Sequence, residues 1–574
     1  MSTDPAFSPD ADLILRARTW LAEDPDERTR GELEQVLAAV DAGDEAAYGD
    51  LSDRFAGTLE FGTAGLRGRL GAGPNRMNRV VVTRAAAGLV AYLRDQGARP
   101  GDSVVIGYDA RHGSRRFAQD TAEVVTGAGL RALTLPEALP TPVLAYAIRE
   151  LGCVAGVMVT ASHNPPADNG YKVYLGDGSQ IVSPADAGIA ERIAAVGPVT
   201  QVPRGDGGEV LDQQVLDRYL DTVAGLPADG PRDLVTVYTP LHGVGGSTVA
   251  TVMEQAGFPA PHVVEAQEEP DANFPTVEFP NPEEPGAMDL AMELAARVGA
   301  DLVVANDPDA DRCAAAVPAP ATPHSKQGGW RMLRGDEVGA LLASHLLRRG
   351  AQGVYATSIV SSSLLGRLAE DAGQGYAETL TGFKWIGRVE GLAFGYEEAL
   401  GYCVDPEHVR DKDGVSALLL LCELAAQAKA DGRTLLDLLD DLAIGHGLHA
   451  TDQVSVRVTD LSLIGATLDR LRATPPTSMG GFAVTSAEDL AVGSPDLPPT
   501  DGLRYRLAEG GRVVVRPSGT EPKLKCYLEV VVDVDCAVDE TDEEVRRDAV
   551  GAARIAAAGR LDAIRADLVE AAGL

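Results

Sequence analysis

Short apolar, β-branched segments alternate with Ala/Leu-rich helical segments along most of this chain, and this pattern constrains the fold more than any other feature. Each apolar segment ends in a Gly, Asp, Ser or Pro turn, and examples lie at 104–109, 156–160, 234–239 and 302–306. Strands that alternate with helices indicate α/β units with mostly parallel sheets. The sequence therefore predicts three consecutive α/β domains with mixed, mostly parallel sheets.

The two ends of the chain follow different patterns. Residues 1–50 are acidic and have helical apolar periodicity at 13–21 and 33–40. From about residue 450, strand-like segments alternate at 454–458, 513–515 and 527–534, and a long Ala/Arg/Asp-rich helix near 542–571 follows. We therefore expect an N-terminal helical extension and a C-terminal α+β domain.

Pro/Gly-rich stretches at 205–208 and 318–329 place the boundaries between domains. A chain of 574 residues has room for three to five domains of ordinary size. The predicted segments are 1–50 for the helical extension, followed by domains at 51–207, 208–320, 321–448 and 449–574.

The charge of the chain excludes several classes of partner. The formal net charge is −35, and a field of that sign repels nucleic acid phosphates and anionic lipids. There is no run of about 18 uncharged apolar residues, and the N-terminus is acidic where a secretory signal would be basic. We expect a cytoplasmic protein with no nucleic acid or membrane partner, which is a monomer or a weak homodimer.

Cysteine and lysine usage adds two expectations. The six cysteines form no Cys-x-x-Cys pair, so buried free thiols are favoured over disulfides or zinc ligands.

Lysine occurs at only seven positions, and arginine supplies the other basic residues. Lysine differs from arginine in shape, hydration and acidity, so the lysines that lie within motifs are candidates for function. They are Lys172, Lys384, Lys412, Lys523 and Lys525.

A first polar motif follows the apolar segment 156–160. It reads Thr160-Ala-Ser162-His163-Asn-Pro and continues to Lys172. A serine on a tight turn at the C-terminal end of a strand is well placed as an exposed nucleophile. His163 and Lys172 could stabilise charge or move protons. An ordinary Asn-Pro turn is the alternative.

A second motif follows the segment 302–306 and contains Asp307, Asp309, Asp311 and Arg312. Carboxylates at alternate positions can converge on a hard cation, and magnesium takes oxygen ligands and leaves room for water and phosphate. An EF-hand is excluded, because its required Gly and Glu positions are occupied by Arg and Pro. A solvated acidic turn is the remaining alternative, but the mutual repulsion of three carboxylates favours a metal site.

Two further motifs are suited to a phosphosugar. The run from Arg516 to Lys525 contains Ser-Gly-Thr, and its backbone N–H groups, hydroxyls and flanking cations form a phosphate cradle without Walker spacing. The alternative is a basic hairpin turn. The run Gly395-Tyr-Glu397-Glu398-Ala-Leu-Gly-Tyr places two carboxylates where they could accept hydrogen bonds from sugar hydroxyls, although a surface loop is equally compatible.

Together these motifs resemble the α-D-phosphohexomutases, the family of phosphoglucomutases and phosphomannomutases. The resemblance covers about residues 55 to 535 and includes Phe61-Gly-Thr-Ala-Gly-Leu-Arg67-Gly and Gly107-Tyr-Asp-Ala-Arg111. It implies four domains around a central cleft, each contributing one loop. It also implies an isomerase that moves a phosphoryl group within a phosphosugar by way of a phosphoserine and a sugar bisphosphate.

The resemblance also implies a role for each matching residue. Ser162 is similar to the phosphoserine, and the magnesium ligands would be Asp307, Asp309, Asp311 and a phosphoserine oxygen. Lys172 matches a proton-transfer position, and Arg67 and Lys384 match basic active-site positions. We also count His163 as catalytic. The expected substrate-binding residues are Arg312, Glu397, Glu398, Arg516, Ser518, Gly519, Thr520 and Lys523.

One departure from the family's motifs affects which sugar we expect as the substrate. Many phosphoglucomutases have Gly-Glu-x-Ser in the sugar loop, whereas this chain has Ala399 at the serine position. The loop and the long N-terminus resemble the subgroup of phosphopentomutases and type 2 phosphoglucomutases. The main expectation is interconversion of glucose 1-phosphate and glucose 6-phosphate, with Mg²⁺ and glucose 1,6-bisphosphate as activator. A phosphopentomutase, a phosphomannomutase, a phosphatase and a non-catalytic phosphosugar-binding protein are the alternatives.

Overall fold

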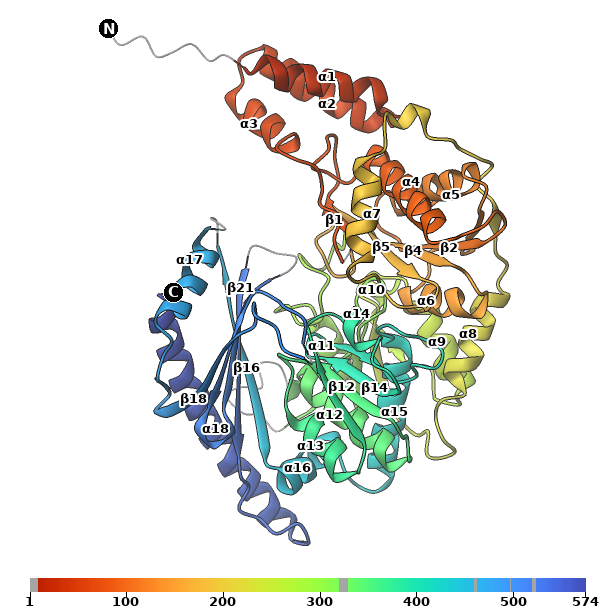
Figure 1. Cartoon of the computed structure of the whole chain (residues 1–574). Coiled ribbons are helices and arrows are strands. Elements are labelled where there is room, and N and C mark those ends of the chain that lie inside the picture. The colour runs from red at the N-terminus through yellow and green to blue at the C-terminus, as the bar shows by residue number, and fades with distance from the viewer. Residues whose placement is uncertain are drawn as a thin grey trace. The chain divides into compact units, whose positions relative to one another are not determined.

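The computed structural model describes residues 9–63, 65–319, 329–458, 462–495, 497–518 and 523–573 (Figure 1). The chain forms two compact units. The first unit contains Met1–Asp229, Leu234–Arg331 and Asp405–Leu419. The second unit contains Gly230–Asp233, Met332–Val404 and Leu420–Leu574.

Three helices begin the first unit. They are α1 (Ala11–Glu23), α2 (Glu27–Asp41) and α3 (Glu45–Arg54). Each helix follows an aspartate whose carboxylate accepts a hydrogen bond from a backbone N–H of the first turn, which stabilises the helix start. Their apolar faces form a small core that includes Leu13, Trp20 and Leu33. The helical periodicity at 13–21 and 33–40 is confirmed.

The first sheet has six strands. Their order is β1 (Leu66–Arg69), β5 (Asp168–Leu175), β4 (Ala155–Val159), β2 (Ser103–Tyr108), β3 (Arg131–Thr134) and β6 (Glu209–Val210). Strands β4, β2, β3 and β6 are parallel, and β5 and β1 add two antiparallel pairings at one edge. Because β2 and β4 are buried on both faces, their sequences are continuously apolar.

Helices cover both faces of this sheet. They are α4 (Arg79–Asp95), α5 (Ser114–Gly127), α6 (Thr141–Glu150) and α7 (Ala185–Ala194). Figure 1 shows α4, α5 and α7 on one face and α6 on the other. A short 3₁₀ helix, η1 (Val199–Gln201), follows α7.

The second sheet of the first unit has five strands. Their order is β11 (Trp330–Met332), β10 (Ala314–Pro318), β9 (Leu302–Ala305), β7 (Thr236–Thr239) and β8 (His262–Val263). The three strands β9, β7 and β8 are parallel, and β10 is antiparallel to β9. The helices of this region are α8 (Gln214–Ala224), α9 (Gly246–Gln255), α10 (Glu265–Glu268) and α11 (Asp289–Val298).

The second unit begins with a four-stranded sheet. Its order is β13 (Gly375–Thr379), β12 (Val354–Ser358), β14 (Leu392–Glu397) and β15 (Gly401–Cys403). Strand β12 is parallel to both neighbours, and β15 is antiparallel to β14. The helices along this part of the chain are α12 (Gly335–Arg348), α13 (Leu364–Asp371), α14 (Phe383–Ile386), α15 (Gly414–Ala430) and α16 (Leu435–His446).

The C-terminal part of the second unit is a six-stranded antiparallel sheet. Its order is β16 (Leu448–Arg457), β21 (Lys523–Val532), β20 (Arg512–Pro517), β19 (Leu503–Leu507), β18 (Phe482–Asp489) and β17 (Ser478–Met479). Helices α17 (Ser462–Ala473) and α18 (Glu543–Ala572) pack on the sheet, and the 3₁₀ helix η2 (Ala508–Gly510) joins β19 to β20.

The predicted fold class is confirmed: three α/β sheets of mixed, mostly parallel type precede a C-terminal α+β domain. The described cysteines are free thiols, and all except Cys536 are buried. None of the helices that the structure describes is both long and apolar enough to cross a bilayer. The exact domain boundaries stay predictions, although Asp405–Leu419 packs in the first unit rather than with its neighbours in sequence.

Two glycines give a test of the packing between α4 and α7. A Cβ on Gly88 of α4 would lie 2.7 Å from the backbone nitrogen of Ile193, whereas a Cβ on Gly49 of α3 would meet nothing within 4 Å. We expect Gly88→Ala to reduce the free energy of unfolding by about 1–3 kcal/mol. Gly49→Ala should increase it by about 0.5–1 kcal/mol, because alanine favours the helix. Thermal unfolding followed by circular dichroism would contradict this packing if both variants were equally stable.

Candidate active site

Ser162 lies on a strained turn that follows β4. Its backbone has a φ of +51°, in the left-handed region that residues with a side chain rarely adopt. The backbone N–H of Ser162 donates to Thr160 Oγ1 at 2.9 Å, and the residue is only 2% exposed. Strain of this kind costs about 1–3 kcal/mol and persists where surrounding contacts hold it.

Arg111 supplies those contacts. Its guanidinium donates to the carbonyl oxygens of Ser162 at 2.5 Å and Asn164 at 2.6 Å. It also donates to the carbonyls of Pro165 at 2.9 Å and Asp168 at 3.3 Å. Three of these carbonyls belong to the turn and the fourth to the first residue of β5, so one buried side chain fixes the backbone that follows β4 up to the start of β5.

Arg111 is in turn held in place by its own neighbours. Its Nε lies 3.4 Å from Asp109 Oδ2, and its guanidinium lies over the ring of Phe274 at 4.9 Å from the centroid. Burial lowers the pKa of Arg111, and the charge of Asp109 opposes that shift. The turn that carries Ser162 is therefore supported by Asp109, which follows β2, and by Phe274 in the segment between α10 and α11.

The three aspartates of the second motif converge beside Ser162. Asp307, Asp309 and Asp311 lie just after β9, are 0% exposed, and offer oxygens that are all within 4.8 Å of one another. Ser162 Oγ donates to Asp307 Oδ2 at 2.7 Å. The carboxyl ends of β4 and β9 thus bring together two motifs that are 145 residues apart in sequence.

Three cations compensate these carboxylates. Lys172 Nζ lies 2.7 Å from Asp309 and 2.8 Å from Asp311, and Lys412 Nζ lies 3.2 Å from Asp311. Arg312 Nε lies 3.7 Å from both Asp307 and Asp311. The three aspartates and these three cations carry equal and opposite formal charge, and Lys412 also pairs with Asp411 at 3.3 Å. Two of the seven lysines of the chain lie here.

The pKa shifts follow from this arrangement. Burial and the negative charges of Asp309 and Asp311 raise the pKa of Asp307 well above its usual value. Burial opposes ionisation of Asp309 as well, but Lys172 outweighs it and lowers the pKa of that carboxyl. Lys172 is also buried, yet Asp309 and Asp311 raise its pKa, so it keeps its proton at neutral pH.

The donor set fits a magnesium ion. Asp309 Oδ1 and Asp311 Oδ1 are buried and accept no hydrogen bond from the residues that the structure describes. Buried carboxylate oxygens of this kind suit a hard divalent cation, which magnesium is. The described residues that could hold the ion are Asp307, Asp309 and Asp311, with Ser162 at hydrogen-bonding distance from the first of them.

His163 follows Ser162 on the turn, and Arg67 of β1 contacts the turn. His163 Nδ1 is 3.4 Å from Ser162 Oγ, and Arg67 Nη1 donates to Asn164 Oδ1 at 3.0 Å. Burial and the nearby charges of Arg312 and Arg67 lower the pKa of His163 well below its usual value. The imidazole is therefore neutral at physiological pH, and its surroundings oppose its protonation.

Lys412 reaches the carboxylates because its segment is anchored in the first unit. The adjacent Asp411 accepts hydrogen bonds from Tyr174 Oη and Gln180 Nε2, both at 2.7 Å. Asp413 accepts one from Tyr219 Oη at 2.9 Å. These aspartates on either side of Lys412 fix the backbone of a segment whose neighbours in sequence belong to the second unit.

The other predicted site residues belong to the second unit. Glu397 ends β14, Lys384 lies on α14, and Arg516 and Lys523 lie on β20 and β21. Ser518 N donates to the carbonyl oxygen of Lys523 at 2.8 Å across the predicted phosphate loop. Ser358 and Ser361 donate hydrogen bonds to the carboxylate of Glu398. Gly519 and Thr520 lie outside the described residues, and the roles of all these residues stay predictions.

Several residues of the site had no role in the sequence analysis. Thr141 donates through its backbone N–H to Asp309 O at 2.9 Å and through Oγ1 to Asp309 Oδ2 at 2.7 Å. Nothing in the local sequence of Thr141 indicates this contact. The sequence indicates Arg111 only through the family resemblance, and Lys412 only as a lysine within a motif. Their functions depend on distant backbone atoms that a linear pattern does not place.

Comparison with known proteins identifies the family. Models of the phosphoglucomutase/phosphomannomutase domains match the chain in order: alpha/beta/alpha domains I, II and III at residues 58–198, 217–319 and 334–443, and the C-terminal domain at 454–547. The chain belongs to the phosphoglucomutase/phosphomannomutase family. The resemblance drawn from the motifs is confirmed, and so is the prediction of an isomerase, since the relatives are mutases.

Relatives within this family have different names. A Haemophilus influenzae protein named "Probable phosphomannomutase" is 48% identical over 82% of this chain and 97% of its own length. A phosphoglucomutase of Staphylococcus haemolyticus is 35% identical over 83% of this chain and 91% of its own length. Human phosphopentomutase is 33% identical over 91% of this chain and 92% of its own length. The names thus indicate the mutase family and differ in the sugar.

The cation at Lys172 gives a test of the site that needs no activity assay. We expect Lys172→Met to reduce the apparent free energy of unfolding of the metal-free protein by about 3–5 kcal/mol, because it leaves buried carboxylates uncompensated. Added Mg²⁺ should restore part of the loss. The measurement is thermal unfolding in EDTA and in Mg²⁺.

Lys429→Met is the matched control, since Lys429 is partly exposed and lies 3.6 Å from the exposed Asp233. It should change stability by at most about 1 kcal/mol in either buffer. Equal midpoints for Lys172→Met and wild type, with no response to Mg²⁺, would contradict the assigned charge balance.

Proposed function

We propose that this protein is a magnesium-dependent phosphosugar mutase that interconverts glucose 1-phosphate and glucose 6-phosphate through a phosphorylated Ser162. The observation that carries the proposal is the position of Ser162 Oγ, 2.7 Å from the buried Asp307 in a cluster of three carboxylates. A hydroxyl held at a cluster of oxygen ligands is suited to carry a phosphoryl group beside a divalent cation.

Charge balance supports the pairing of metal and phosphate. The three carboxylates and the cations Lys172, Lys412 and Arg312 are already neutral together. A phosphoserine adds about −1.5 to −2 at pH 7, which Mg²⁺ would offset. When bound, magnesium supplies electrostatic stabilisation of the phosphoryl oxygens. Asp307, Asp309 and Asp311 would hold it.

The reaction requires two transfers. In the first, a hydroxyl oxygen of the bound sugar phosphate forms a bond to the phosphorus of phospho-Ser162, and the bond from that phosphorus to Oγ breaks. The hydroxyl proton passes to a base, and the neutral His163 is one candidate, while Lys172 remains an ammonium that offsets charge. In the second transfer, Ser162 Oγ forms a bond to the phosphorus at the other end of the sugar bisphosphate, and the bond from that phosphorus to the sugar oxygen breaks. The sugar oxygen takes up the proton released in the first transfer, and phospho-Ser162 is regenerated.

Arg111 and the turn that carries Ser162 would keep the phosphoryl group aligned with the substrate. The phosphoryl donor must keep one position through both transfers, and misplacement by about 1 Å costs large factors in rate. The proposed binding residues Arg67, Arg312, Glu397, Glu398, Lys384, Arg516, Ser518, Gly519, Thr520 and Lys523 would hold the sugar and its second phosphate. The phosphate loop should accept either phosphate, because the bisphosphate must react at both ends.

A pentose phosphate is the second candidate substrate. Human phosphopentomutase aligns with 91% of this chain, against 82% for the Haemophilus relative, and Ala399 stands where many phosphoglucomutases have a serine. Mannose phosphate is the third candidate, because the Haemophilus relative carries that name. Rates on glucose, mannose and ribose 1-phosphates, with Mg²⁺ and a bisphosphate activator, would decide among them. A cytoplasmic location and a monomeric or weakly dimeric state stay predictions.

Removal of the nucleophile is the central test of the proposal. Ser162→Ala should reduce kcat by about four orders of magnitude or more, because no other group can carry the phosphoryl. Ser179→Ala is the control: its hydroxyl is buried in the same unit and has no hydrogen-bond partner among the described residues, so activity should be retained. Full activity of Ser162→Ala with bisphosphate present would reject the assignment. An inactive wild type that binds phosphosugars would favour the non-catalytic alternative.

Chelation provides a second test. Metal-free enzyme prepared with EDTA should lose turnover, and Mg²⁺ should restore it, because buried carboxylates alone cannot offset the charge of the transferred group. The products should be measured together with free phosphate. Isomer without phosphate release supports the mutase, whereas net release of inorganic phosphate indicates a phosphatase. Unchanged turnover without metal would assign the three aspartates another role.

A further inference from the structure

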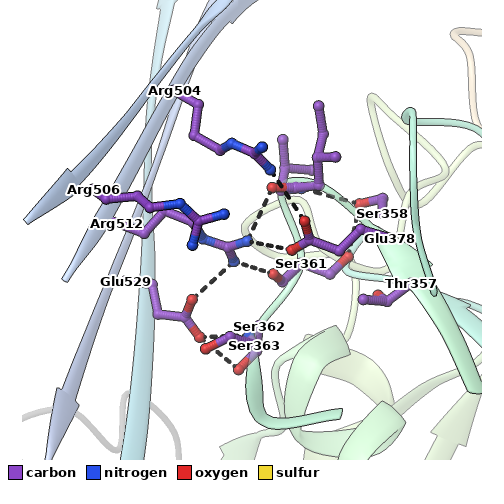
Figure 2. Close-up of polar contacts among 12 residues, drawn as sticks. Thr357, Ser358, Ser361, Ser362, Ser363, Glu378, Arg504, Arg506, Arg512 and Glu529 are labelled. Atoms are coloured by element: carbon purple, nitrogen blue, oxygen red, sulfur yellow. Dashed lines mark hydrogen bonds and ion pairs between the residues drawn. The ribbon is translucent and has the colours of Figure 1, made fainter. Parts of the chain in front are cut away.

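Residues 358–363, here called the serine turn, link β12 to α13 in the second unit. Their sequence is Ser358-Ile359-Val360-Ser361-Ser362-Ser363. The turn contacts two parts of the unit, as Figure 2 shows for its side facing the C-terminal sheet. On one side lies Glu398 of the predicted sugar loop, and on the other lie Arg512 and Glu529 of strands β20 and β21.

The hydroxyls of the serine turn fix Glu398. Ser358 Oγ and Ser361 Oγ donate to Glu398 Oε2 at 3.1 Å and 2.9 Å. Ser361 Oγ also accepts from the backbone N–H of Glu398 at 3.0 Å. Both the carboxylate and the backbone of Glu398 are therefore oriented by this turn.

The carbonyl oxygens of the serine turn are fixed by Arg512. Its guanidinium donates to Ile359 O at 3.2 Å and to Ser361 O. Glu529 completes the contact, since its Oε1 accepts from Ser362 Oγ at 2.8 Å and from Ser363 N at 2.7 Å. Ser361 thus contacts Arg512 through its carbonyl and Glu398 through its hydroxyl.

Apolar side chains also connect the serine turn to strands β20 and β21. Ile359 and Val360 are buried in a small core with Val514 of β20 and Tyr527 of β21. Arg512 is 7% exposed and is paired with Glu529 at 2.8 Å and Glu378 at 3.2 Å, so its charge is fully compensated. Strands β20 and β21, which flank the predicted phosphate loop, are therefore fixed to the turn that orients Glu398.

We propose that Arg512 is a positioning residue for substrate binding, which orients Glu398 through Ser361 and keeps the strands of the phosphate loop in register with the sugar loop. The proposal rests on the proposed function for the roles of Glu398 and of the loop. A lysine at this position would keep the charge, but its single ammonium could not serve two carbonyls and two carboxylates in the geometry of a planar guanidinium.

Arg504 is a matched control on the neighbouring strand β19. It is 8% exposed and pairs with Glu378 at 3.1 Å and Glu488 at 2.7 Å. No hydrogen bond or ion pair from Arg504 to the serine turn is present in the described part of the chain. Arg504→Lys therefore makes the same substitution at a buried, ion-paired arginine of the same sheet that lacks the contact to Ser361.

The kinetic test compares Arg512→Lys, Arg504→Lys, Glu398→Gln and the double variant of Arg512 and Glu398. Arg512→Lys should raise KM for the sugar phosphate about tenfold with kcat within about threefold, the size expected for losing oriented hydrogen bonds to a charged group. Arg504→Lys should leave KM within about twofold of wild type. If Arg512 acts through Glu398, the double variant should have the KM of Glu398→Gln alone. The proposal would be overturned if the two substitutions multiplied their effects on KM in the double variant. It would also be overturned if Arg504→Lys raised KM as much as Arg512→Lys does.

Amide hydrogen exchange provides a readout that does not depend on catalysis. Peptides covering 396–402 should exchange at least about tenfold faster in Arg512→Lys than in wild type or Arg504→Lys, because the Glu398 N–H loses its fixed acceptor. Unchanged exchange in all three proteins would overturn the positioning role even if the enzyme is active. An inactive wild type with faster exchange in Arg512→Lys would instead reject the proposed function and retain the link between Arg512 and Glu398.

Discussion

Three carboxylates buried within 4.8 Å of one another are the arrangement on which the first unit depends. Such a cluster is strongly unfavourable without positive charge, since burial and mutual repulsion both oppose ionisation. Its compensation comes from three places in the chain: Arg312 in the same loop, Lys172 on β5 of the other sheet, and Lys412 in Asp405–Leu419. The charge cluster thus explains why segments distant in sequence must converge here.

The same cluster resolves the apparent conflict between an acidic protein and an anionic substrate. A net charge of −35 repels phosphate at long range. Mobile ions screen that field over about 8 Å at physiological ionic strength, so the charges nearest to Ser162 decide what binds there. Those charges are balanced, and Arg67, Arg111 and His163 add donors or a neutral base beside the serine. An acidic surface and a local phosphate site are therefore compatible.

The proximity of Ser162 and the aspartates was predictable, whereas the residues that hold them were not. Both motifs follow apolar strands, and the ends of such strands are where α/β folds build sites, so the motifs had a physical reason to meet. Thr141, Asp411 and Arg111 act through contacts with residues 51 to 237 positions away. Side chains of this kind lie in unremarkable local sequence, because their partners are backbone atoms or residues of another element.

The two basic residue types have separate physical tasks in this molecule. Lys172 and Lys412 contact carboxylates as compact charges, which the crowded cluster can accommodate. Arg111 and Arg512 instead donate to backbone carbonyls of the turns that follow β4 and β12. A planar guanidinium with five donors can fix several carbonyls at once, which an ammonium cannot do with the same geometry. At Lys172 and Lys412, charge density therefore matters more than hydrogen-bond direction.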